Sequence, residues 1–460
     1  MTKHKISAAW RIVIIVFAVL AMLIGISYMP LSKWTNGRMS NFNLFGDILN
    51  IGLPEEVDMP GAYIDPMLEE AIEEDKREID TAAVASDSKP LIAIQPKKEG
   101  DLVIIEDYSE SGHGLERLRN ALDSGRMARI AVIGDSYIEG DIFTEDLREM
   151  LQQKHGGCGV GYVNMHSEFP GFRKSVKQGG GKGWKEYAAN SKHDGKYMGL
   201  TQHYYKLSSP TTSTYSGTSA FKGTDGWNQS KFLFISPVEA EITITDDNGP
   251  RTYQVSASDS VQSIMVDGWT TKFDVKVSNS SVIGLGVWLT DSKGVNVDCM
   301  SSRGFSGITL GKVSEDLSSQ MAGYINYDLI ILEFGINAMS AKQTNFDTYR
   351  NKMIDVIRHI RKCYPDADIL MMGIGDRGSK RGSEVHSMSA CTYMVDAQRE
   401  AARHGRCLFW DTREAMGGED AIVEWVRQGW ANTDYIHMNH KGGRKLAEPL
   451  YKAIQHNLSK

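Results

Sequence analysis

Cysteine is scarce in this sequence. Its 460 residues include five cysteines, which form no C-x-x-C pair and no Cys/His spacing of the kind that holds a metal. This excludes a disulfide-built scaffold and a zinc module. We expect these cysteines to be buried as small apolar residues, and we expect neither a metal nor an organic cofactor. They are Cys158, Cys299, Cys363, Cys391 and Cys407.

Clusters of basic residues are missing as well. The formal net charge is -7 at pH 7, and no stripe of Lys and Arg with interleaved aromatic residues occurs. A protein that binds nucleic acid needs a basic surface to neutralise phosphates, so we exclude that class of partner. The glycine-rich stretch VKQGGGKGW lacks the Gly-Lys-Ser/Thr ending of a phosphate-binding loop and is typical of a flexible loop.

Only one long hydrophobic run is present, and it lies near the start of the chain. Residues 12–29, IVIIVFAVLAMLIGISYM, are 18 residues without a charge, about the minimum that crosses a bilayer as a helix. Basic residues precede the run, which predicts a cytoplasmic N-terminus. A cleaved signal peptide is the alternative, but ISYMPLS lacks small residues at the cleavage position. We predict a membrane anchor over residues 1–29 and an extracytoplasmic body, in the periplasm or at the cell surface.

Residues 30–112 show no sustained hydrophobic period. This segment is acidic, contains several prolines and ends in small, polar residues. Such a composition is typical of a tether. We therefore predict an acidic linker between the membrane and the body.

Buried strands alternate with amphipathic helices in two parts of the remaining chain. ARIAVIGDS is apolar on both faces, as in a central parallel strand, and TEDLREMLQQKHGG follows as an amphipathic helix. The same alternation returns over YDLIILEFG, FDTYRNKMIDVIRHIRKC, DILMMGIGD and RCLFWD. This pattern predicts an α/β fold with a doubly wound parallel sheet and helices on both faces. We assign residues 113–165 and 297–460 to this domain.

Residues 166–296 have a different character. They are rich in Gly, Ser, Thr and aromatic residues, and AEITITDD, RTYQVSAS and TKFDVKVSN alternate with a period of two. We predict an inserted antiparallel β-sandwich. Trp184 and Trp227 have polar, glycine-rich neighbours, so we predict that they lie at the surface and stack on sugars, whereas Trp288 belongs to the core.

A serine stands where the first buried strand ends. Ser136 lies at the edge where ligands of such sheets bind. A serine nucleophile needs a base that is oriented by an acid. His437 in NTDYIHMNHKGG is the candidate base, and Asp434 is the acid. His440 lacks an aspartate at this spacing, so we expect it to be a polar residue near a helix start.

Three groups are candidate donors to an oxyanion. The backbone N–H of Ser136 is expected at a helix N-terminus, where such donors are free. The Asn337 amide follows the strand YDLIILEF, and Gly304 in DCMSSRGFSG permits a close backbone approach. Asn337 and Gly304 each have an ordinary alternative as turn residues, and Gly307 competes with Gly304.

Together these blocks resemble the SGNH (GDSL-type) hydrolase superfamily. In order, the chain has Gly-Asp-Ser, a glycine loop, Gly-x-Asn and Asp-x-x-His. The resemblance implies a flavodoxin-like sheet, with Ser136 as nucleophile and His437 as base oriented by Asp434. It also implies that Ser136, Gly304 and Asn337 form the oxyanion hole.

The stretch IGDSYIEGDIFTEDLREMLQQKHGGCGVGYV is similar to bacterial peptidoglycan O-acetylesterases, which carry a β-sandwich resembling a carbohydrate-binding module at the same place. This implies an exported serine esterase that removes O-acetyl groups from a cell-wall or other glycan. Tyr137 departs from the relatives, which often have His or Gln there, so we predict that Tyr137 shapes the substrate pocket. GINAM also lacks the acidic residue that commonly follows the asparagine.

Two alternatives stay open. A glycan O-acyltransferase would use the same acyl-enzyme, with a sugar hydroxyl in place of water. A catalytically inactive glycan-binding protein at the cell surface would instead have Ser136 and His437 too far apart to meet.

Overall fold

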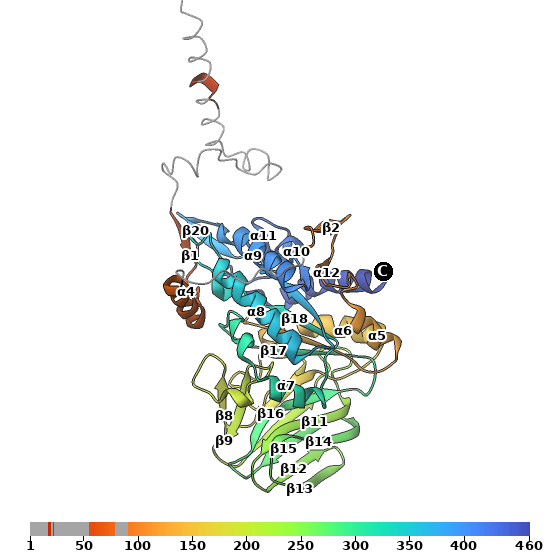
Figure 1. Cartoon of the computed structure of the whole chain (residues 1–460). Helices are drawn as coiled ribbons and strands as arrows, with labels where there is room; N and C mark the ends of the chain where they lie inside the picture. The colour runs from red at the N-terminus through yellow and green to blue at the C-terminus, as the bar shows by residue number, and fades with distance from the viewer. Residues whose placement is uncertain (1–16, 20–21, 23–54, 79–90) are drawn as a thin grey trace, which may run out of the picture. The chain divides into compact units, whose positions relative to one another are not determined.

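The computed structural model describes residues 17–19, 22, 55–78 and 91–460 (Figure 1). The predicted membrane segment, residues 12–29, lies almost wholly outside this part. Within it, no helix has the length and apolar character needed to span a bilayer, and the anchor stays a prediction. The elements described below belong to one compact unit, which contains residues 57–380 and 385–460.

The central sheet has six strands, and five of them run parallel. Their order across the sheet is β17 (Val295–Ser301), β5 (Ala128–Gly134), β18 (Leu329–Glu333), β19 (Asp368–Met372) and β22 (Leu408–Trp410), with β4 (Glu106–Asp107) antiparallel at the edge. Numbered along the chain, the parallel strands follow the order 2-1-3-4-5, as in flavodoxin-like folds. The predicted fold class is thereby confirmed for this domain.

Helices cover both faces of this sheet. One face carries α7 (Glu315–Ala322), α8 (Asp347–Cys363) and α9 (Ala390–Gly405), and the other carries α5 (Glu116–Asp123), α6 (Thr144–His155) and α12 (His440–Leu458). Successive strand residues face opposite sides, so Ile130 and Val132 pack with the second set, while Ala131 and Ile133 pack with the first. This double burial explains why the strands are apolar without alternation.

The inserted segment forms two antiparallel sheets (Figure 1). One contains β7 (Val176–Gly180), β10 (Thr211–Gly217), β15 (Lys272–Val277), β12 (Ala240–Asp246) and β13 (Gly249–Val255). The other contains β8 (Trp184–Ala188), β9 (His203–Leu207), β16 (Ile283–Thr290), β11 (Trp227–Ser236) and β14 (Ser258–Thr270), and β6 (Gly161–Val163) also pairs with β16.

The sandwich is joined to the α/β domain through its second sheet. On β16, Val287 and Leu289 face the core between the two sheets, whereas Trp288 packs into the core that contains Ile330 and Leu332 of the parallel sheet. The sandwich therefore shares one apolar core with the α/β domain. Trp288 is a core residue, as predicted.

The predicted linker over residues 30–112 is folded wherever the structure describes it. It contains α4 (Pro66–Glu78), the two-residue strands β2 (Lys98–Glu99) and β3 (Leu102–Val103), and the edge strand β4. Met59, Leu68 and Tyr108 are buried. These apolar residues are too widely spaced, and the strands too short, to produce a visible period, so composition alone was misleading here.

Candidate active site

Three neighbouring strands bring the predicted residues to one edge of the sheet. Ser136 follows β5, the segment with Gly304 follows β17, and Asn337 follows β18. Because β17 and β18 flank β5 on either side, this edge is the switch point at which ligands of open α/β sheets bind.

The loop before α12 places a base beside the serine. His437 Nε2 lies 2.9 Å from Ser136 Oγ, and His437 Nδ1 lies 2.9 Å from Asp434 Oδ2. The second carboxylate oxygen of Asp434 accepts the backbone N–H groups of Ile436 and His437 at 2.9 and 3.0 Å. This arrangement permits proton transfer from serine to histidine, and it excludes the separated geometry of an inactive site.

The electrostatics of Asp434 suit an acid that stays ionised. Partial burial raises its pKa, but hydrogen bonds from the His437 ring and from the two backbone N–H groups outweigh burial and lower this pKa below its usual value. A carboxylate therefore faces the Nδ1 of His437 at neutral pH.

Asp135 has a different role. Its Oδ1 accepts the backbone N–H of Tyr137 at 2.9 Å, which is the turn-stabilising role that we predicted. Its Oδ2 accepts Asn337 Nδ2 at 2.9 Å, and the same amide also donates to Phe305 O at 3.2 Å. Asp135 therefore holds Asn337 beside the serine, and one amide hydrogen must be shared or released if Asn337 is to serve an oxyanion.

A pocket of about 80 Å³ opens over the serine. Ser136, Gly304, Asn337 and His437 all line it. Gly304 has a φ of +83°, and a Cβ there would lie 3.0 Å from the ring of Tyr63. Gly307 instead precedes the short helix η3 (Ile308–Lys312) and packs against Phe334. Of the two glycines, Gly304 is the one at the site.

Sequence reasoning missed the residues that hold the two flanking loops. Arg377, which follows β19, is buried and donates from Nη1 to Ile336 O at 2.7 Å and to Met339 O at 3.2 Å, on either side of Asn337. The sequence signal that could have indicated Arg377 is its position as a polar residue just beyond the end of the fourth parallel strand.

Asp65 and Tyr63 come from the predicted linker. The backbone N–H of Asp65 donates to Asn337 O at 2.9 Å, and its Oδ2 accepts both the N–H and the hydroxyl of Ser306 at 2.7 Å. Tyr63 lines the pocket over Gly304. No spacing in that part of the sequence connects either residue to the catalytic blocks.

None of the three predicted substrate contacts lies at the surface, although Trp184 lines the larger pocket described below. Tyr137 is 1% exposed and packs against Met416, because the residue after the nucleophile turns into the core beneath the sheet edge. Trp184 and Trp227 are 4% and 0% exposed, and their Nε1 groups donate to Ser213 and Ser230. The first five residues of the glycine-rich stretch form β7 and the next three form a short turn, after which β8 begins at Trp184 and places the indole in the sandwich core.

Of two local predictions near the site, the structure contradicts the one for Ser136 and agrees with the one for His440. Helix α6 begins at Thr144, and the short helix η1 (Glu139–Asp141) intervenes, so Ser136 lies in a turn and not at a helix N-terminus. His440 is the first residue of α12 and pairs with Glu145 at 2.6 Å, which agrees with its predicted place near a helix start.

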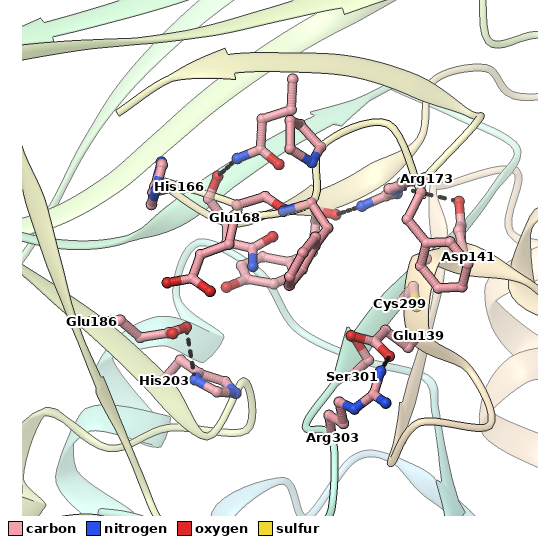
Figure 2. A pocket seen from close by; sticks show the side chains of 18 of the residues that line it. Glu139, Asp141, His166, Glu168, Arg173, Glu186, His203, Cys299, Ser301 and Arg303 are labelled. Carbon is pink, nitrogen blue, oxygen red and sulfur yellow. Dashed lines mark hydrogen bonds and ion pairs between the residues drawn. The ribbon is translucent and has the colours of Figure 1, made fainter. Parts of the chain in front are cut away.

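A larger pocket of about 360 Å³ lies between the sandwich and the catalytic edge. Figure 2 shows Glu186 and His203 on one side, and Glu139, Ser301 and Arg303 on the other. Arg303 also lines the smaller pocket. The two pockets therefore meet at Arg303.

Residues 267–445 match the model of the GDSL-like Lipase/Acylhydrolase family. This range contains Gly304, Asn337, Asp434 and His437, which the structure brings together with Ser136. The chain has an SGNH hydrolase domain. A comparison with curated proteins found no match.

A solved structure of a peptidoglycan O-acetylesterase is similar to this SGNH chain, with a TM-score of 0.63 and 24% identity, covering 77% of this chain and 99% of that chain. This similarity supports the fold, including the inserted sandwich. A family two carbohydrate esterase from Cellvibrio japonicus has a TM-score of 0.26 and 10% identity, covering 61% of this chain and 99% of that chain. A salicylyl-acyltransferase from a tetracycline pathway has a TM-score of 0.27 and 11% identity, covering 62% and 98%. Neither score is high enough to bear on function.

Proposed function

We propose that this SGNH domain is a serine esterase that removes O-acetyl groups from a glycan of the peptidoglycan type. The observation that carries the proposal is the unbroken series from Asp434 through His437 to Ser136, with both distances at 2.9 Å. The series opens into a pocket of about 80 Å³. The similarity to a peptidoglycan O-acetylesterase supports the glycan substrate.

The geometry supports acyl transfer in two halves. His437 Nε2 accepts the Ser136 proton while Oγ attacks the acetyl carbonyl, and the carbonyl electrons move to its oxygen. The N–H groups of Ser136 and Gly304 and the amide of Asn337 are the donors proposed for this oxyanion. When the intermediate collapses, the sugar oxygen leaves with the proton from His437. A water molecule then gives one proton to His437 and attacks the acyl carbonyl. The bond to Ser136 Oγ breaks, Oγ takes the proton back from His437, and acetate is released.

Replacing the nucleophile tests the proposal. We expect Ser136→Ala to abolish hydrolysis of p-nitrophenyl acetate and acetate release from O-acetylated peptidoglycan, with the melting temperature unchanged within a few degrees. Mass spectrometry with an added oligosaccharide separates hydrolysis from transfer, because transfer yields an acetylated sugar. Equal hydrolysis by the wild type and Ser136→Ala would refute the proposal.

The location of the enzyme is part of the same proposal. An uncharged run over residues 12–29 with basic residues before it supports a membrane-anchored body outside the cytoplasm. In fractionated cells, we expect to find the full chain in the membrane fraction. We also expect added protease to digest its body once the cell envelope outside the cytoplasmic membrane has been made permeable. Recovery in the soluble cytoplasmic fraction would contradict this part of the proposal.

A further inference from the structure

A second series of acid, histidine and serine lies beside the active site. Glu186 is on β8, His203 is on β9 and Ser302 follows β17. His203 Nδ1 lies 3.0 Å from Glu186 Oε1, and His203 Nε2 lies 3.1 Å from Ser302 Oγ. The order and the distances are close to those of Asp434, His437 and Ser136. Figure 2 shows the pair of Glu186 and His203 in the wall of the larger pocket.

Ser302 is not placed to act as a nucleophile. Its side chain is 1% exposed, and its hydroxyl also accepts Gln202 Nε2 at 3.2 Å. Its backbone instead fixes the loop that carries Gly304: the Ser302 N–H donates to Gly134 O at 2.8 Å, and the Ser302 carbonyl accepts the N–H of Phe305 at 3.1 Å. Ser302 therefore anchors the loop on both sides of Gly304.

The sandwich contacts this segment at a second point. Gln202 is fully buried with a φ of +57°, an uncommon conformation for a residue with a side chain. Its Oε1 accepts the hydroxyl of Thr309 at 2.5 Å, while its Nε2 donates to Ser302. Such a conformation persists where the surroundings determine it strongly. Gln202 and His203 together hold the segment from Ser302 to Thr309.

Glu186 is suited to orient the histidine. Burial raises its pKa, but the His203 ring 3.0 Å away and the hydrogen bond from the Tyr205 hydroxyl outweigh burial and lower it, so the group is a carboxylate at neutral pH. A carboxylate beside Nδ1 favours the tautomer with its proton on Nδ1. In that tautomer, Nε2 accepts a hydrogen bond from the Ser302 hydroxyl, and the Ser302 oxygen accepts a hydrogen bond from the Gln202 amide.

We propose that His203, supplied by the inserted sandwich, is a positioning residue that sets the Gly304 N–H for the oxyanion by holding Ser302. The inference rests on the proposed esterase function and deepens it, because it gives the sandwich a part in the chemical step. Removing a whole oxyanion donor costs about 10²–10³ in kcat. A displaced donor costs less, so the expected loss is about tenfold.

The first test compares His203→Ala, His203→Gln and His166→Ala by kcat and KM for p-nitrophenyl acetate. His203→Ala is expected to lower kcat about tenfold with KM within about twofold, because the effect lies in the transition state. His203→Gln is expected to recover most of kcat, since its side-chain amide can reach Ser302. His166→Ala is the matched control, because His166 lines the same pocket but bonds Gly180 O. An unchanged kcat in His203→Ala, or no recovery in His203→Gln, would overturn the inference.

Ser302→Ala keeps the test decisive if His203→Ala unfolds. It removes the same hydrogen bond from the other side, so it is expected to lower kcat to a similar extent, and His203→Ala on top of it is expected to add little. Additive losses, or wild-type kcat in Ser302→Ala, would contradict the proposal.

A second readout separates this inference from the esterase proposal. Phosphonylation of Ser136 by a fluorophosphonate needs only the triad and the oxyanion donors. If the wild type cleaves no acetyl ester, the esterase proposal fails. The rate at which the fluorophosphonate labels Ser136, compared between the wild type and His203→Ala, still tests the role of His203. A labelling rate about tenfold slower in His203→Ala supports the role of His203, and equal rates refute it.

Discussion

Two aspartates near Ser136 differ in what surrounds their carboxyl groups. Asp434 accepts hydrogen bonds from the His437 ring and from the backbone, and its pKa is lowered. Asp135 and Glu333 are both buried: burial raises the pKa of Asp135 to about 7, and burial together with the charge of Asp135 raises the pKa of Glu333 well above its usual value. The environment of each residue assigns Asp434 to the histidine and Asp135 to the turn and Asn337.

Gly304 gives a prediction at the scale of one residue. Gly304→Ala is expected to lower kcat about 100-fold, because the positive φ disfavours alanine by about 1–2 kcal/mol and the new Cβ would press on Tyr63. Gly429→Ala is the matched control, because Gly429 has a φ of +70° with no atom within 4 Å of the added Cβ. Steady-state kinetics and thermal melts of both variants check this. If both variants lose stability equally and both retain wild-type kcat, Gly304 has no part in the oxyanion hole.

Among the elements, the segment before α4 has an unexpected place. Asp65 precedes the helix and accepts Met67 N–H at 3.0 Å, while its other oxygen binds Ser306. One side chain thus joins the helix start to the loop beyond Gly304, and its backbone joins Asn337. The N-terminal segment is therefore part of the active-site framework and not a tether alone.

Asp65→Ala tests this role of the element. The change leaves a buried N–H and hydroxyl of Ser306 without their acceptor, which costs about 1–3 kcal/mol. We expect kcat for p-nitrophenyl acetate to fall about tenfold, because the loop beyond Gly304 loses its side-chain support at Ser306 while the backbone bond to Asn337 is kept. Asp75→Ala is the control, because Asp75 is partly exposed and lies on α4, the helix that Asp65 precedes. Urea unfolding and kinetics at pH 7 measure both effects, and identical behaviour of the two variants would contradict the assignment.

For the whole molecule, a buried ion cluster joins the sandwich to the catalytic domain. Arg148 on α6 binds Asp141 with two hydrogen bonds of 2.8 and 2.7 Å and donates to Val297 O at 2.7 Å. Arg173 lies 3.3 Å from Asp141 and donates to Val160 O and Tyr162 O, which lead into the sandwich. Burial alone raises the pKa of Asp141, but the two guanidinium groups outweigh it and hold this pKa well below its usual value.

This cluster predicts how stability depends on pH. A carboxyl whose folded-state pKa is lowered stabilises the fold above its unfolded pKa of about 3.9, and that stability is lost as the pH falls below this value. Asp141→Asn is expected to cost about 3–5 kcal/mol at pH 7, because the buried Arg148 and the partly buried Arg173 lose their partner. The difference from the wild type is expected to shrink at pH 3. Urea unfolding at both pH values checks it, and a difference that does not depend on pH would contradict the ionised state of Asp141.

The sheet edge and the main site residues could be predicted from the sequence, because the signals for them lie among neighbouring residues. Ser136 and Asn337 follow apolar strands directly, so the change from apolar to polar marks the sheet edge, and Asp434 and His437 are only three residues apart. The burial of Tyr137 and Trp227 depends on how sheets and helices stack over them, which no neighbouring residue reports. Asp65 acts through contacts with loops far along the chain.

The place of the insertion has a consequence for how the protein folds. β5 and β17 pair residue by residue in parallel, although the whole sandwich lies between Gly134 and Val295. Closing so long an unfolded loop carries an entropic cost that a folded sandwich with adjacent ends removes. Pairings of such large sequence separation form slowly. We therefore expect refolding to be rate-limited by the sandwich, so that the proposed esterase activity appears only after the inserted sandwich has folded.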